Sequence, residues 1–131
     1  MIVVDTSVLI AVARGEPAVE RLLRVFESGE PMVMSAASYV ETGMVLARRF
    51  GPPALGHLGR LREAVPLHLR DVDAEQADAA LDAFTRYGKG MGHPAQLDFG
   101  DCFAYALAKT ADAPLLYVGE DFARTDIRSA L

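Results

Sequence analysis

Asp5 is the first side chain in the sequence whose type and position suggest chemistry. It follows the β-branched run Ile2–Val4, which is too short for a helix and predicts a buried strand. Thr6 and Ser7 come next, and an apolar pattern of helical length then resumes. Ligands of open α/β sheets bind at the carboxyl ends of strands, so an acid here is suited to holding a cation. The same residues also fit a plain helix N-cap, and the sequence leaves both interpretations open.

Glu41 and Asp101 are two further acids that stand among apolar residues in predicted helices. Glu41 has no Lys or Arg on its helix face, so we expect it to point inward, where an unpaired carboxylate is costly. The alternative is an exposed place on the helix flank. Apolar residues on the other sides of this helix, 36–50, predict that it is buried over much of its surface. Asp101 precedes the stretch 102–108, whose only polar group is the Tyr105 hydroxyl besides the Cys102 thiol, so we expect it beside the core and against a helix dipole. Asp98, three residues earlier, is explained as the N-cap of the same helix.

Asp121 and Glu120 follow the apolar run Leu115–Val118, which predicts another strand. Like Asp5, they stand where a strand ends, at the sheet edge where ligands gather. Asp121 precedes Phe122 and is the stronger candidate, although a turn-forming Asp is a fair alternative. Glu120 fits a solvent-facing position equally well.

Four acids, Asp5, Glu41, Asp101 and Asp121, are therefore candidates for one shared site. Two unit charges about 4 Å apart repel by about 4 kcal/mol at an effective dielectric near 20, so four carboxylates together require protonation or a cation. Oxygen ligands without paired His or Cys favour Mg²⁺, or Mn²⁺, over Zn²⁺. A divalent ion held in this way can activate water for phosphodiester hydrolysis without a covalent intermediate.

The elements that must position these acids alternate between strands and helices. Strands are predicted at 2–4, 31–34, 67–69 and 115–118. Helices are predicted to begin at Pro17 and after Asp5, Ser35, Pro53, Asp73 and Asp98. Such alternation predicts an α/β fold, with a short parallel sheet of four to five strands flanked by helices on both faces. At 131 residues without a repeat or linker, the chain is expected to be one domain, residues 1–131.

Composition limits the compartment but leaves the substrate open. Cys102 is the only cysteine, which excludes an intramolecular disulfide and favours a reducing compartment. The N-terminus has no signal-peptide pattern, and the longest apolar run is far shorter than the ~20 residues of a spanning helix. We therefore expect a soluble, cytoplasmic protein. The net charge of −5 argues against nucleic acid at first sight, but acids that converge on a cation count against the total without repelling phosphate.

Four blocks of sequence resemble the PIN-domain ribonucleases, specifically the VapC toxins of bacterial toxin–antitoxin pairs. They are Val3–Ala11, Ser38–Thr42 with Val45–Arg49, Leu97–Ala106, and Gly119–Phe122 with Thr125–Ile127. The resemblance implies a parallel-sheet fold, Mg²⁺-dependent RNA cleavage, a cognate antitoxin and homodimers.

By the family pattern, the metal-binding and catalytic acids would be Asp5, Glu41, Asp101 and Asp121, with Thr6 or Ser7 assisting beside Asp5. The chain departs from the pattern at two positions. Asp98 stands where relatives commonly have Asn, and Glu120 where Asp is common, so either could add charge to the site.

Two other functional classes compete with a metal-dependent ribonuclease. An aspartyl-phosphate phosphohydrolase would use Asp5 as its nucleophile, but that chemistry usually needs a second acid two residues on, where this chain has Ser7. A catalytically inactive binding module would use the acids only as helix caps. A Mg²⁺-dependent gain in stability would separate the enzyme from the module.

Overall fold

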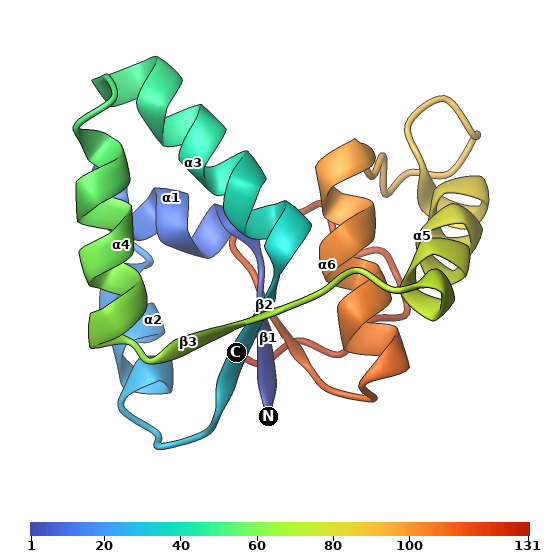
Figure 1. Ribbon diagram of the computed structural model, residues 1–131. Coiled ribbons are helices and arrows are strands. Elements are labelled where there is room, and N and C mark those ends of the chain that lie inside the picture. The colour runs from blue at the N-terminus through green and yellow to red at the C-terminus, as the bar shows by residue number, and fades with distance from the viewer.

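The chain folds into four short strands and six helices, and the computed structural model describes all 131 residues (Figure 1). In chain order the elements are β1 (Ile2–Val4), α1 (Thr6–Arg14), α2 (Val19–Phe26), β2 (Met32–Ser35), α3 (Ala36–Phe50), α4 (Ala54–Ala64), β3 (Leu67–Arg70), α5 (Ala74–Tyr87), α6 (Phe99–Thr110) and β4 (Leu115–Leu116). None of the helices is long and apolar enough to cross a membrane.

The four strands form one sheet in the order β3-β2-β1-β4, and every neighbouring pair is parallel. The central strand β1 pairs Val3 with Val33 on one side and with Leu115 on the other. All residues of β1 and β2 are buried, as expected for central strands of a parallel sheet covered on both faces. The predicted fold class is confirmed.

Helices cover both faces because side chains alternate along the strands. Val3 points into a core cluster with α5 and α6, whereas Ile2 and Val4 point into a second cluster with α1, α3 and α4. Figure 1 shows these two groups of helices on opposite sides of the strands. The carboxyl ends of the parallel strands therefore meet at one edge of the sheet, between the two groups.

Two details of the sequence prediction were wrong. The last strand, predicted to reach Val118, ends at Leu116, because the Val118 N–H donates to the Ser7 hydroxyl (3.0 Å) instead of to a neighbouring strand. Helix α3 was expected to be buried over much of its surface, but Val40 is 57% exposed and Met44 65% exposed. Only the sides of α3 that face α1, α4, α6 and the sheet are buried.

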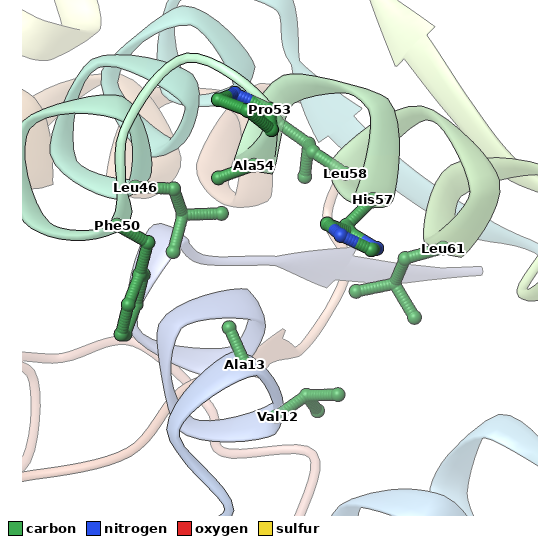
Figure 2. Close-up of a pocket in the computed structure, with 9 residues that line it drawn as sticks. All are labelled: Val12, Ala13, Leu46, Phe50, Pro53, Ala54, His57, Leu58 and Leu61. Atoms are coloured by element: carbon green, nitrogen blue, oxygen red, sulfur yellow. The ribbon is translucent and has the colours of Figure 1, made fainter.

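A mostly apolar pocket of about 510 Å³ has none of the predicted acids in its lining (Figure 2). Its lining residues come from the second half of α1, the end of α3 and α4: Val12, Ala13, Leu46, Phe50, Pro53, Ala54, His57, Leu58 and Leu61. The pocket contains no carboxylate, so the acid chemistry predicted from the sequence must be located elsewhere.

Candidate active site

Asp5 lies at the junction of β1 and α1 and is only 4% exposed. Its backbone is extended, and its Oδ2 accepts a hydrogen bond from the Ser7 N–H (2.9 Å), so it is the N-cap of α1. Burial raises the pKa of the Asp5 carboxyl, hydrogen bonds from Thr6 and Ser7 partly oppose the rise, and the charge of Asp98 reinforces it. The capping role and the site role coexist at this residue, since a cap alone does not require burial.

Thr6 connects the start of α1 to Glu41 on α3. The Thr6 Oγ1 lies 2.9 Å from Glu41 Oε1 and 3.0 Å from the Ser38 carbonyl, and Thr42 Oγ1 lies 3.1 Å from Thr6 Oγ1 and 2.8 Å from the same carbonyl. The two hydroxyls have one proton each. With Glu41 ionised, Thr6 therefore donates to Glu41, and Thr42 donates to the Ser38 carbonyl or to Thr6.

The Glu41 side chain is half-buried, in agreement with the predicted inward position more than with an exposed helix flank, and it lies near the charges of Asp98 and Asp5. Burial raises the pKa of its carboxyl, the hydrogen bond from Thr6 opposes the rise, and the charges of Asp98 and Asp5 add to it. The carboxylate lies against the backbone of α6 at Gly100, so closely that a Cβ on Gly100 would overlap it. Glu41 therefore joins α1, α3 and α6 at one point.

Asp98 and Asp101 form a reciprocal capping box at the start of α6. Asp98 Oδ1 accepts from the Asp101 N–H (2.9 Å), and Asp101 Oδ2 accepts from the Asp98 N–H (3.0 Å). Burial raises the pKa of Asp101 from 3.8 to about 8, the hydrogen bond from Asp98 opposes the rise, and the charges of Asp98, Asp5 and Asp121 increase it. The N-cap predicted at Asp98 is confirmed.

Asp121 reaches the same region from the segment after β4. The hydrogen bond from the Val118 N–H to the Ser7 hydroxyl ties this segment to the start of α1. Asp121 is exposed, and its charge contributes to the raised pKa of Asp101. Glu120 is also exposed, but it is not among the charges that shift the pKa of Asp5, Glu41 or Asp101. The two residues thus differ in how closely they engage the other acids.

The site has no cation of its own. No Lys or Arg lowers the pKa of Asp5, Glu41 or Asp101, and the six ion pairs of the protein all lie elsewhere. In the arrangement seen, no three His, Cys, Asp or Glu side chains lie close enough to hold one metal ion, and the Asp101 carboxylate is turned back onto Asp98. In donor type the site fits a hard divalent cation, because all its groups are oxygens and their charge is uncompensated.

Three residues at the site were not predicted from the sequence. Thr42 supports Thr6, Gly100 makes room for Glu41, and the Ser38 hydroxyl is buried without a hydrogen-bond partner. A signal for Gly100 was available, because glycine is unfavourable inside a helix and this one stands in the first turn of α6, beside Asp101. Ser38 and Thr42 stand in one of the blocks that carry the family resemblance, but their residue types alone do not indicate the contacts with Thr6, which depend on the packing of α1 against α3.

A parallel sheet with acids at the carboxyl ends of its strands is the arrangement that the family resemblance implied, and comparison with known proteins identifies the class. The PIN domain family model matches residues 2–128. Ribonuclease VapC30 of Mycobacterium tuberculosis is 46% identical over 125 residues, which cover 95% of each chain. Ribonuclease VapC42 of the same organism is 41% identical over 128 residues, which cover 98% of each chain. The chain belongs to the PIN-domain family, and these relatives place it among the VapC ribonucleases.

Solved structures agree with this assignment at the level of the fold. The Mycobacterium tuberculosis toxin VapC20, described as cleaving the sarcin–ricin loop, is similar with a TM-score of 0.78 at 21% identity, covering 97% of this chain and 96% of that one. A toxin–antitoxin complex from Klebsiella pneumoniae is similar with a TM-score of 0.68 at 18% identity, covering 96% of this chain and 93% of that one.

Proposed function

We propose that this protein is a Mg²⁺-dependent endoribonuclease, the toxin of a type II toxin–antitoxin pair, which hydrolyses RNA phosphodiester bonds. The observation that carries the proposal is the uncompensated negative charge at the sheet edge. Burial without a nearby cation raises the pKa of Asp5, Glu41 and Asp101, the charges of neighbouring acids add to the rise, and the pKa of Asp101 reaches about 8. The names of the VapC relatives support ribonuclease as the activity.

In this proposal, Asp5 and Asp101 are the principal Mg²⁺ ligands, and Glu41 and Asp121 complete the acidic site. Mn²⁺ would serve in place of Mg²⁺, because both prefer oxygen ligands. To bind the ion, Asp101 would release its capping bond to the Asp98 N–H. A bound divalent ion would supply charge to offset the developing charge on the phosphate and would make water a better nucleophile.

The remaining groups hold these acids in place. Thr6 orients Glu41 through the 2.9 Å contact, and Ser7 holds Asp5 with its N–H and the segment before Asp121 with its hydroxyl. Asp98 adds negative charge next to Asp5 and Asp101, and Glu120 adds it at the outer edge. One of the carboxylates would accept the proton of the attacking water.

RNA would approach along exposed basic side chains that make no ion pair within the protein. Arg14, Arg48, Arg49 and Lys89 are all exposed and take part in none of the six ion pairs. They would contact phosphates, which position the substrate without reading its sequence. Such an enzyme would act in the cytoplasm, where its RNA substrates are.

The proposal includes two protein partners. An antitoxin would inhibit the enzyme by placing a Lys or Arg among acids that have no cation of their own. The toxin would also pair with a second copy of itself, which sedimentation of the purified chain would measure. The similarity to a toxin–antitoxin complex supports the antitoxin, and the family resemblance supports the homodimer.

The decisive experiment is cleavage of defined RNA by the purified protein. Transfer and ribosomal RNA would be incubated with Mg²⁺, with Mn²⁺ and with a chelator, and the cut ends would be mapped. We expect discrete cuts that need the divalent ion. Intact RNA under all conditions would contradict the enzyme and favour a binding module, and a phosphoryl adduct on Asp5 would favour the phosphohydrolase.

A further inference from the structure

Gly100 occupies the second position of α6, between Phe99 and Asp101, where a glycine has no backbone reason to be. Its φ does not lie in the left-handed region that favours glycine, and glycine is less favourable than alanine inside a helix by about 1 kcal/mol. A side chain at this position would meet the Glu41 carboxylate, since an added Cβ would overlap Cδ and both oxygens of Glu41. The lack of a side chain at position 100 thus makes room for the Glu41 carboxylate.

The Glu41 carboxylate is also held by a hydrogen bond from α1. Thr6 Oγ1 contacts Glu41 Oε1 at 2.9 Å, and Thr42 stands behind Thr6 at 3.1 Å. The carboxylate therefore contacts both the Thr6 hydroxyl and the start of α6 at Gly100. The first turn of a helix favours a negative charge nearby, because its N–H groups are not all used inside the helix.

We propose that Gly100 is a positioning residue, which allows the Glu41 carboxylate to lie against the start of α6, beside Asp101. The inference rests on the proposed function, in which Glu41 completes the Mg²⁺ site. A Cβ at position 100 would occupy the place of the Glu41 carboxylate, which would have to turn away from α6 and out of the geometry of its 2.9 Å contact with Thr6. The absence of a Cβ at position 100 thereby sets how closely α3 brings its acid to Asp5 and Asp101.

The first test is the Gly100→Ala variant, with Gly59→Ala as its matched control. Gly59 lies inside α4, and a Cβ added there meets nothing within 4 Å. Mg²⁺ affinity would be measured by calorimetry, and we expect it to fall about tenfold or more in Gly100→Ala and to stay unchanged in Gly59→Ala. The melting temperature without metal should remain close to that of the wild type in both variants. In Gly100→Ala the higher helix propensity of alanine should offset the loss of the Thr6–Glu41 hydrogen bond.

A second variant separates a steric effect from a general disturbance. Glu41→Asp shortens the side chain by one methylene, which withdraws the carboxylate from position 100. We expect Glu41→Asp to weaken Mg²⁺ binding strongly in the wild-type background and little in the Gly100→Ala background. Additive losses would overturn the inference, since they would mean that position 100 does not act through Glu41.

A readout without metal keeps this inference separate from the proposed function. In a crystal structure of metal-free Gly100→Ala, Glu41 Oε1 should no longer lie within hydrogen-bond distance of Thr6 Oγ1. An intact Thr6–Glu41 bond, or wild-type Mg²⁺ affinity in the variant, would overturn the role of Gly100. If the wild-type protein itself binds no Mg²⁺ while the bond is lost in the variant, the proposed function fails and the steric role stands.

Discussion

Two carboxyl groups along α6 have pKa values shifted in opposite directions. At its start, Asp101 lies among other acids, and burial and their charges raise its pKa to about 8. Further along, Tyr105 and Lys109 bind Asp126 at 2.6 and 2.8 Å, and Arg86 lies 3.6 Å from it. Burial opposes ionisation of Asp126 too, but these hydrogen bonds outweigh it and lower its pKa to about 2.

The fold neutralises the charge of Asp126 with nearby cations, but it leaves the acids at the sheet edge without one. Asp126 has two cations and a phenol within reach, so it fastens the C-terminal segment to α5 and α6 without help from outside. Asp5, Glu41 and Asp101 have only hydroxyl and N–H donors, which orient carboxylates but do not offset their charge. This uncompensated charge costs stability in the metal-free protein, and in the proposed function an external cation would offset it.

The largest effect is expected at Asp5. Asp5→Asn keeps an oxygen for the Ser7 N–H and so retains the cap, but it removes the most buried charge of the site. RNA cleavage should fall about a hundredfold or more, together with the Mg²⁺-dependent gain in stability. Without metal, thermal denaturation at pH 8 should show a higher melting temperature than that of the wild type, because a buried, unpaired charge is gone.

Asp73→Asn is the matched control for this prediction. Asp73 caps α5 by accepting from the Gln76 N–H at 2.9 Å, and it does not act on the site acids. It should leave cleavage and the Mg²⁺ response unchanged. Equal losses of activity in the two variants would show that Asp5 matters only as a cap.

The pH dependence of stability should differ in sign between the two ends of α6. The raised pKa of Asp101 means that the folded protein binds more protons than the unfolded chain, so metal-free stability should fall as pH rises from near 4 to about 8. The lowered pKa of Asp126 stabilises the fold above the unfolded pKa, and this contribution should be lost as pH falls toward 2.

Denaturant titrations across this pH range, with and without Mg²⁺, would measure both slopes. Saturating Mg²⁺ should remove the decline between pH 4 and 8, because the ion keeps the carboxylates ionised. Mg²⁺ should not change the loss of stability toward pH 2, which comes from Asp126. A metal-free stability that rises steadily from pH 4 to 8 would contradict the uncompensated charge at the site.

A smaller effect is expected at Thr6, which orients an acid without offsetting its charge. Thr6→Val preserves the shape of the side chain and removes the hydrogen bond to Glu41. We expect Mg²⁺ affinity and cleavage to fall about tenfold, measured by calorimetry and by initial rates on RNA. Thr6→Ser keeps the hydroxyl and should stay near the wild type, so a similar loss in Ser and Val variants would exclude the hydrogen bond as the cause.

The smallest effect on activity is expected at Asp126. Asp126→Asn weakens the contacts with Lys109 and Tyr105, and because the group is partly exposed the cost should be only about 1 kcal/mol, or roughly 4 °C in melting temperature. The Mg²⁺-dependent rise in melting temperature should remain. A variant that melts like the wild type but no longer responds to Mg²⁺ would reverse the roles assigned to the two regions.

Most of the fold could be predicted from the sequence, because its signals are local. Asp5, Ser35, Asp73 and Asp98 all cap helices as predicted, and the apolar runs form the four parallel strands. The end of the last strand could not be predicted, because it depends on a hydrogen bond between Val118 and Ser7, which are 111 positions apart in the chain.

The candidate site could be predicted only in part. The types and positions of Asp5, Glu41 and Asp101 were sufficient to name them, since an acid after a strand or on an apolar helix face stands out. The bond between Thr6 and Glu41 joins residues 35 positions apart, and the space that Gly100 provides exists only once α3 and α6 are packed. Local sequence patterns do not predict contacts between residues that are far apart in the chain.

The most direct measurement of the central claim is the melting temperature of the wild-type protein as Mg²⁺ is added at pH 8. An ion that binds the acids of the folded protein should stabilise it by about 2.7 kcal/mol at 100 times the dissociation constant, and the melting temperature should rise with the logarithm of the Mg²⁺ concentration. A melting temperature that does not change from chelator to millimolar Mg²⁺ would contradict the claim that the acids at the sheet edge await a cation.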